Sequence, residues 1–207
     1  ILQMVYMLDR PVKLQKINPP APTPPVEARP RTLSASAIEI LMRDPYEIYA
    51  KYILKLKPLE ELENPLNTSD YGNLIHKILE KFNTKFPNEL PNNAYSELIQ
   101  IALDELSKTN ADSQVRAFWW PLLEKTAKWI IKTETEYRKN ITHTYAEVQG
   151  NIQIQAPAGE FTITARADRV DITTEGKINI VDYKTGTPRS KDEVNAGYAP
   201  QLPIEGL

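Results

Sequence analysis

Two stretches near the end of the chain decide the fold: Ala165-Arg166-Ala167-Asp168-Arg169-Val170-Asp171 and Val181-Asp182-Tyr183-Lys184-Thr185-Gly186. The residues leading into both alternate between two faces with period two, which is typical of β-strands. In the second stretch this alternation places Asp182 and Lys184 on the same strand face. The intervening Thr174-Glu175-Gly176 predicts a tight connection, so the two strands are expected to form a hairpin.

A turn centred on Glu175 would set Asp168 directly across from Asp182. Like charges opposed across two strands are destabilising, and each carboxylate raises the proton affinity of the other unless the pair is neutralised. A hard divalent cation is a natural neutralising partner, because Mg²⁺ is typically held by one or two carboxylates together with substrate phosphate. The hairpin therefore predicts a metal site of the nuclease type. The alternative is a surface salt bridge between Asp182 and Lys184 on a solvated strand.

Other residues are candidates for the same site. His76 follows Gly72 by one helical turn, so backbone without a side chain lies beside the imidazole and permits close approach of a ligand. His76 is a candidate third metal ligand that would favour Mn²⁺ somewhat, or else an ordinary histidine at the edge of the core. Glu147, at the start of a predicted strand, is either an accessory carboxylate or a solvated charge. Gln201 is a candidate contact to a phosphate or to Lys184.

The composition excludes several classes of protein. The chain has 207 residues, of which 41% are hydrophobic and 25% charged, as in a globular domain. It has no cysteine, so disulfides, thiolate metal sites and iron–sulfur clusters are excluded within this sequence, and a reducing cytoplasm is expected. No apolar run is long enough to span a bilayer, and no membrane association is expected. The net charge of −2 argues against an independent DNA clamp, so if the protein acts on DNA, something else is expected to hold the DNA.

The chain divides into three expected parts. Residues 1–10 begin without Met and are expected to end a preceding domain. Residues 11–31 contain seven prolines and predict an extended linker, with a ligand for a proline-reading domain as the alternative. Residues 32–207 form the expected folded domain, which stops without a terminal helix and is therefore expected to be truncated at its C-terminus.

Periodicity predicts the elements of this domain. Helices are expected from a capping box at Ser36 to Glu39, from Asp44, from Thr68 to about Phe86, and over 94–108 and 114–139. Strands are expected over 145–156, 160–172 and 177–184. A helical first half followed by strands indicates an α+β fold, with helices packed on a small mixed sheet that carries the hairpin. The aromatic residues of the last helix, including Trp119 and Trp129, are interpreted as core rather than as a surface for stacking on DNA bases.

The order of these motifs resembles the PD-(D/E)XK nuclease superfamily, specifically its RecB-type nuclease domain. The resemblance runs from about Leu33 to Leu207 and rests on Leu33-Ser34-Ala35-Ser36, Pro45-Tyr46, Gly72-Asn73-Leu74-Ile75-His76, Glu147, the two hairpin stretches and Gln201-Leu202. The approach Arg29-Pro30-Arg31-Thr32 and the segment 43–50 further resemble the C-terminal nuclease domain of AddB, the second subunit of the AddAB helicase–nuclease, as found in alphaproteobacteria.

The resemblance implies a restriction-endonuclease-like α/β core and metal-dependent hydrolysis of DNA phosphodiester bonds. The implied catalytic set is His76, Asp168, Asp182 and Lys184. Mg²⁺ or Mn²⁺ would be held by His76, Asp168, Asp182 and the backbone carbonyl of Tyr183, and Lys184 would act on the attacking water. Accessory or DNA-contacting roles are implied for Glu147, Gln201, Gly72 and Arg169.

The resemblance also implies a biological setting. Such a domain would cut single-stranded DNA, as an exonuclease, after an AddA-like helicase subunit has unwound it during double-strand-break repair. The alternative is a catalytically silent DNA-binding or scaffold module of the same complex. The sequence departs from the family in two places. Many relatives have a cysteine where Asp44 stands and three more near the C-terminus for an iron–sulfur cluster, so none is expected here. The usual Gln-x-x-x-Tyr runs from Gln201 to Glu205, which leaves the Tyr role vacant.

Overall fold

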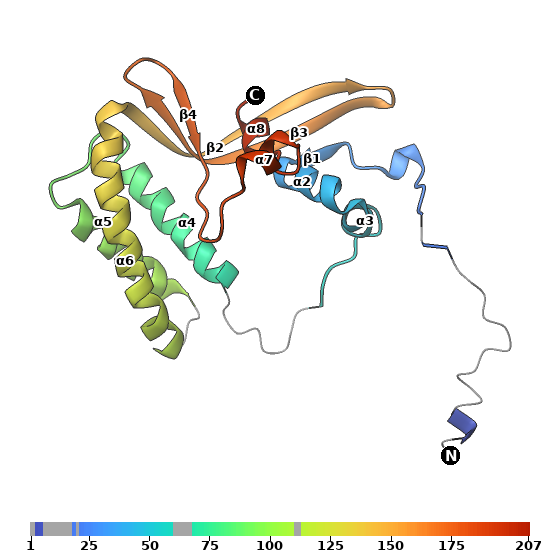
Figure 1. Ribbon diagram of the computed structural model, residues 1–207, viewed down its shortest axis with the longest axis horizontal. Coiled ribbons are helices and arrows are strands. Elements are labelled where there is room, and N and C mark those ends of the chain that lie inside the picture. Colours follow the sequence, from blue (N-terminus) through green and yellow to red (C-terminus); the bar gives the residue numbers. More distant parts are fainter. Residues whose placement is uncertain (1–2, 6–17, 20, 60–67, 110–112) are drawn as a thin grey trace.

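The computed structural model describes residues 3–5, 18–19, 21–59, 68–109 and 113–207 (Figure 1). Most of residues 1–10 and the first part of the Pro-rich stretch, 11–17 and Pro20, lie outside the described residues. The division into a domain end, a linker and a folded domain therefore stays a prediction. In the part of the chain that the structure describes, no helix has the length and apolar character needed to cross a membrane.

The folded part begins with a short strand that sequence periodicity did not predict. After a 3₁₀ turn, η1 (Val26–Ala28), come β1 (Thr32–Ser34), α2 (Ala35–Arg43), α3 (Pro45–Ile48) and a π-helical turn, η2 (Tyr49–Ile53). The predicted capping box at Ser36 is wrong, because Ser34 is the cap of α2 and its Oγ accepts a 3.1 Å hydrogen bond from the backbone N–H of Ala37. The predicted cap at Asp44 is confirmed, since its Oδ1 accepts from the N–H of Tyr46.

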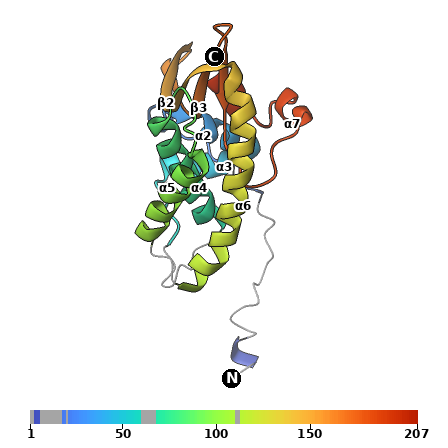
Figure 2. The same ribbon diagram turned by 90° about the vertical axis from the view of Figure 1, so that its left-hand side faces the viewer.

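Three long helices form the main hydrophobic core: α4 (Thr68–Lys85), α5 (Ala94–Lys108) and α6 (Ser113–Tyr137). Their bounds agree with the predicted ranges to within about two residues, and Figure 2 shows them running alongside one another. The interpretation of the α6 aromatics as core is confirmed for Trp119, which is 6% exposed. It is wrong for Phe118 and Trp129, which are 71% and 65% exposed. Helical periodicity shows which residues share a face but not whether another element covers that face.

A four-stranded mixed sheet lies across the ends of the helices (Figure 1). After a 3₁₀ turn, η3 (Arg138–Asn140), come β2 (Ile141–Ala156), β3 (Gly159–Thr173) and β4 (Ile178–Val181), followed by the short helices α7 (Lys191–Asn195) and α8 (Gln201–Glu205). The predicted α+β class, with helices packed on a small mixed sheet, is confirmed. The last strand ends at Val181 rather than at Lys184. The expectation that the domain stops without a terminal helix is wrong, because Gln201–Glu205 form α8.

β3 is the strand that organises this sheet. β2 pairs with one edge of β3 in antiparallel orientation along nearly its whole length. The other edge is shared, since β1 pairs in parallel with residues 162–164 and β4 pairs antiparallel with residues 169–172. Asp168 falls in the interval between these two partners. The sheet therefore exposes the backbone edge of β3 at the position where the sequence places a candidate carboxylate.

Candidate active site

The β3–β4 hairpin has the register that the sequence predicts. Its pairs run from Ile172–Ile178 to Arg169–Val181, and extending them by one residue sets Asp168 opposite Asp182. The turn is closed by a 2.9 Å hydrogen bond from the Gly176 N–H to the Thr173 carbonyl. Gly176 has a φ of 79°, a conformation that favours glycine.

Asp168 is held from two sides. Its Oδ1 lies 3.2 Å from His76 Nδ1, on α4, and its Oδ2 accepts a 2.8 Å hydrogen bond from the backbone N–H of Tyr183. Burial acts to raise the pKa of Asp168, but the contacts with His76 and with the Tyr183 N–H outweigh it, so the pKa lies below its ordinary value. The same contact with Asp168 raises the pKa of His76 against the opposing effect of burial. The structure thus brings together His76 and Asp168, which are far apart in the sequence.

Asp182 lies beside this pair and has its own partners. Its side chain is 7% exposed, and Lys184 Nζ lies 2.9 Å from Oδ2. Gln201, the first residue of α8, donates from Nε2 to Asp182 Oδ1 at 3.2 Å. Gln201 therefore reaches Asp182 rather than Lys184. The half-exposed ammonium of Lys184 faces a carboxylate whose position is fixed from both sides.

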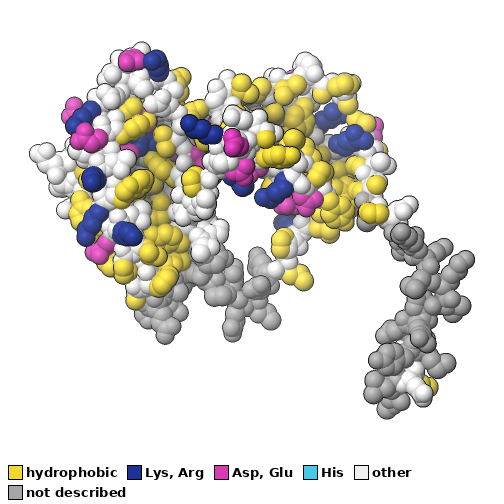
Figure 3. Space-filling model, in the orientation of Figure 1, with side chains coloured by type: hydrophobic (Ala, Val, Ile, Leu, Met, Phe, Trp, Pro, Cys, Tyr) yellow, Lys and Arg dark blue, Asp and Glu magenta, His cyan; other side chains and the backbone are white. Residues whose placement is uncertain are grey.

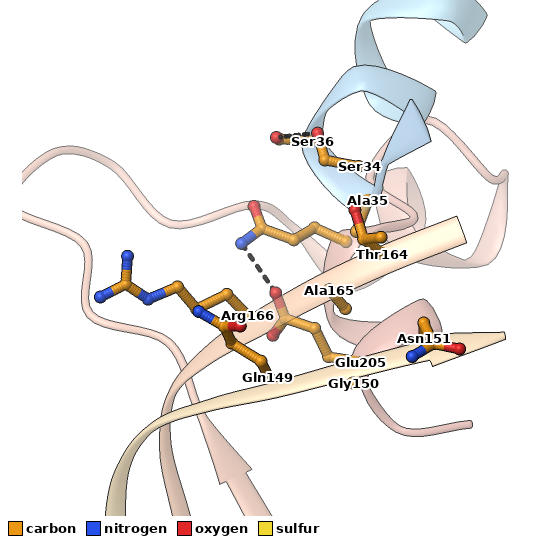
Figure 4. Close-up of a pocket in the computed structure, with 11 residues that line it drawn as sticks. Ser34, Ala35, Ser36, Gln149, Gly150, Asn151, Thr164, Ala165, Arg166 and Glu205 are labelled. Carbon is orange, nitrogen blue, oxygen red and sulfur yellow. Dashed lines mark hydrogen bonds between the residues drawn. The ribbon is translucent and has the colours of Figure 1, made fainter. Parts of the chain in front are cut away.

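Glu205 stands where the resemblance leaves the Tyr role vacant. It accepts a 3.0 Å hydrogen bond at Oε1 from Gln201 Nε2. Burial raises its pKa, and the nearby charges of Asp182 and Asp168 raise it further. With Gln149, Thr164 and other polar side chains it lines a pocket of about 460 Å³ beside the site (Figure 4). Sequence reasoning did not include this carboxylate.

Glu147 lies opposite Asp168 on the neighbouring strand, between the pairs Ala146–Arg169 and Val148–Ala167. Its φ of 56° is unusual for a residue with a side chain. The carboxylate forms an ion pair with Arg166. Burial raises the pKa of Glu147, and the charges of Glu80 and Asp168 add to this effect despite the opposing Arg166.

Glu80 is a second acidic residue that sequence reasoning missed. It lies on α4 one turn after His76, and its charge acts on Glu147. The signal that could have found it was this spacing of four residues, which puts two helical side chains on the same face.

Gly72 and Arg169, two of the residues predicted to have accessory or DNA-contacting roles, contact other parts of the protein. A side chain at Gly72 would bring its Cβ within 3.1 Å of Thr185 Oγ1, so the bare backbone of α4 faces the segment after β4. Arg169 is 1% exposed and forms ion pairs with Asp171 at 2.8 Å and Glu134 at 2.7 Å. A guanidinium enclosed in this way does not reach solvent, and we assign Arg169 to the support of the hairpin rather than to DNA contact.

The residue types around Asp168 fit a hard divalent cation. One imidazole and two carboxylates are donors that Mn²⁺ and Mg²⁺ accept in proteins. As the side chains stand, no three His, Asp or Glu residues within the described ranges are grouped so as to hold a metal ion. The reason is visible in the contacts, since Asp168 is directed to His76 and the Tyr183 N–H, and Asp182 to Lys184 and Gln201. A cation would replace contacts within this set rather than fill a ready-made cage.

The chain forms a mixed sheet packed with helices, and two acidic residues and a lysine lie at the end of the β3–β4 hairpin. This combination is typical of one class of nuclease folds. The model of the PD-(D/E)XK nuclease superfamily matches residues 32–204, and the chain belongs to this superfamily.

The chain is also similar to individual proteins. It is 36% identical over 182 residues to an uncharacterised protein of Rickettsia conorii and 35% identical over 178 residues to one of Rickettsia bellii, each match covering 86% of this chain. It is 25% identical over 191 residues to one subunit of the ATP-dependent helicase/deoxyribonuclease of Clostridium perfringens, covering 81% of this chain and 16% of that protein. The chain spans 21% to 22% of the length of the two rickettsial relatives.

Proposed function

We propose that this chain is a metal-dependent deoxyribonuclease domain that hydrolyses phosphodiester bonds of single-stranded DNA. The observation that carries the proposal is the convergence of the His76–Asp168 pair with the Asp182–Lys184 pair at the open end of the hairpin. A surface salt bridge on a solvated strand would not explain this convergence, because Asp182 is buried and has a second partner in Gln201.

The groups of the chain have separate tasks in this proposal. Mg²⁺ or Mn²⁺, held by His76, Asp168, Asp182 and the Tyr183 carbonyl, would supply Lewis acidity and a water of lowered pKa. Lys184 places a positive charge where the attacked phosphate gains negative charge. Gln201 fixes the direction of the Asp182 carboxylate, and Glu147 offers an acceptor on the strand opposite Asp168.

The biological setting is the finer part of the proposal. Similarity to a subunit of a protein named ATP-dependent helicase/deoxyribonuclease supports a role as the nuclease domain of an AddB-like subunit. In that setting an AddA-like partner would unwind DNA in the cytoplasm, and this domain would degrade one strand as an exonuclease during double-strand-break repair. The net charge of −2 agrees with a domain that receives DNA from other parts of a complex.

Cleavage of end-labelled single-stranded DNA tests the activity. The full-length protein, with its helicase partner, is incubated with Mg²⁺ or Mn²⁺ as wild type, Asp182→Ala and Lys184→Ala. The chain offers a matched control in Glu175 and Lys177, an acidic residue and a lysine at the same spacing on the same hairpin, paired at 2.6 Å and exposed. We expect cleavage to be lost in the two site variants and kept in Glu175→Ala and Lys177→Ala. Unchanged cleavage in both site variants would assign the cutting to another domain.

A catalytically silent DNA-binding or scaffold module of the same complex is the rival function. Mn²⁺ binding measured by calorimetry separates the two. A nuclease domain should bind Mn²⁺ in a manner that Asp168→Ala abolishes, whereas a silent module should bind none at this site.

A further inference from the structure

One face of α6 carries an exposed tryptophan next to a row of lysines. Trp129 is 65% exposed, although large aromatic side chains are usually mostly buried. Lys125, Lys128 and Lys132 recur at helical spacing beside it, and all three are exposed. Among the described residues no carboxylate forms an ion pair with them, whereas the nearby Glu136 is paired with Lys139. Figure 3 shows Lys and Arg side chains beside hydrophobic ones over this part of the molecule.

Trp129 also lines a groove that leads to the candidate active site. The groove has a volume of about 580 Å³ and lies between α4, α6 and the segment that follows β4. Tyr71, Trp129 and Tyr137 contribute aromatic surface from the helices. Asp182, Lys184 and Thr185 line the same groove. The aromatic surface and the candidate cleavage site therefore belong to one continuous hollow.

We propose that this groove is the track of the single strand that the site cuts, with Trp129 stacking on an unpaired base and Lys125, Lys128 and Lys132 contacting its phosphates. The inference rests on the proposed nuclease function and names the path of its substrate. Aromatic faces combined with a row of cations are how proteins hold single strands without sequence preference. A duplex does not fit this surface in the same way, because its bases are paired and cannot stack on Trp129.

The charge distribution supports nucleic acid as the occupant. The chain as a whole carries a net charge of −2, yet Lys125 and Lys132, each about one turn from Trp129 on α6, and the adjacent Lys128 place positive charge outside the rim that Trp129 forms. These lysines do not line the groove itself, but they are exposed and can exchange counterions for the phosphates of a strand that passes over Trp129. An apolar protein partner would be served by the aromatic surface alone and would gain nothing from this row.

Photocrosslinking locates the strand directly. A single-stranded oligonucleotide containing 5-bromodeoxyuridine is bound to the full-length protein with its partner in EDTA, which prevents cleavage, then irradiated and mapped by mass spectrometry. We expect a crosslink within α6 at Trp129 that is absent in Trp129→Ala. Phe118→Ala is the matched control, since Phe118 is an exposed aromatic residue of the same helix that does not line the groove. The crosslink at Trp129 should persist in the Phe118→Ala variant.

Steady-state kinetics provides the second measurement. Trp129→Ala should raise the KM for a single-stranded oligonucleotide about tenfold, as expected for loss of one stacked base, with little change in kcat. Trp129→Phe should restore most of the affinity. Replacing Lys125, Lys128 and Lys132 together by Ala should reduce the salt dependence of binding.

The outcomes separate the nuclease function from the path of its substrate. If Trp129→Ala keeps the wild-type KM and crosslinks map elsewhere, while Asp182→Ala still abolishes cleavage, the nuclease function stands and the track is overturned. If Trp129→Ala instead weakens assembly with the partner subunit at unchanged KM, a protein covers the groove and the track is again overturned. If no variant and no wild type cuts DNA, the nuclease function fails, and the crosslink alone then decides whether DNA lies in the groove.

Discussion

The backbone N–H of Tyr183 donates a 2.8 Å hydrogen bond to Asp168 Oδ2, across the end of the β3–β4 hairpin. The side chain of Tyr183 packs against the helical core and accepts hydrogen bonds from Asn83 at 3.0 Å and Arg169 at 3.3 Å. One residue thus ties the candidate carboxylate to the core of α4, α5 and α6. The position of Asp168 is therefore coupled to the packing of that core.

We expect Tyr183→Phe to separate stability from activity. Loss of the hydroxyl leaves Asn83 and Arg169 without this acceptor and should lower the free energy of unfolding by about 1 to 2 kcal/mol. Cleavage should be kept, because the backbone N–H that holds Asp168 remains. Urea unfolding and the cleavage assay measure the two effects, with the exposed Tyr198→Phe as the control. A fall in cleavage as large as that of Asp182→Ala would show that the hydroxyl takes part in the chemistry.

The contact between His76 and Asp168 predicts a dependence of stability on pH in metal-free protein. The pKa of His76 is raised in the folded state, so its contribution to stability is present below the unfolded pKa of about 6.5 and is lost as the pH rises through the folded pKa. Wild type should therefore be more stable than His76→Gln at pH 6, and this advantage should disappear at higher pH. Chemical unfolding of both proteins at pH 6 and at a pH above the folded-state pKa of His76 measures this difference in stability.

NMR titration of the imidazole gives a direct check of the same pair. Asp168→Asn should lower the pKa of His76, because the hydrogen bond from Asp168 is its largest cause. Mg²⁺ should also lower the apparent pKa, since a ligating imidazole must be neutral. A pKa of His76 that responds to neither change would mean that the pair does not form in solution.

Glu147→Gly is predicted to reduce cleavage without reducing stability. The left-handed backbone at Glu147, with φ of 56°, costs a non-glycine residue about 1 kcal/mol or more, which glycine removes. The lost ion pair with the largely exposed Arg166 is worth little. Thermal unfolding should show a melting temperature at or above that of wild type. Marked destabilisation would instead assign Glu147 a structural role.

Glu105 should contribute stability that acid removes. Burial acts to raise its pKa, but hydrogen bonds from Lys108 and Lys81 outweigh it, so the folded-state pKa is lowered. Stability from this group is present above the unfolded pKa of about 4.3 and is lost as the pH falls through the folded pKa. Glu105→Gln should cost about 1 to 2 kcal/mol at pH 7 and nothing at strongly acidic pH. The exposed Glu175→Gln is the control, and an equal loss at both pH values would contradict the prediction.

The sequence predicted the parts of the fold that depend on local periodicity. The bounds of α4, α5 and α6 follow from their apolar stripes, and the opposition of Asp168 and Asp182 follows from strand parity around Glu175. β1 was missed because a three-residue strand is defined only by its pairing with β3, more than a hundred residues later in the chain.

The candidate site was predictable to a similar degree. Asp168, Asp182, Lys184 and His76 were found by spacing and by family resemblance, whereas Glu80 and Glu205 were missed. The burial of Arg169 could not be predicted in this way, because it depends on Glu134, 35 residues away in the sequence. Nor could the exposure of Trp129, since helical periodicity shows which residues share a face but not whether another element covers that face.

The pairing of His76 with Asp168 also determines when the site can form during synthesis of the chain. The two residues are separated by 92 positions in the chain, and a ribosome adds about 5 to 20 residues per second. For on the order of ten seconds the histidine has therefore left the peptidyl transferase centre while its acidic partner does not yet exist. The hairpin that completes this pair follows α4, α5 and α6 in the chain, so a nascent chain acquires the contact between His76 and Asp168 only after these three helices have had time to fold.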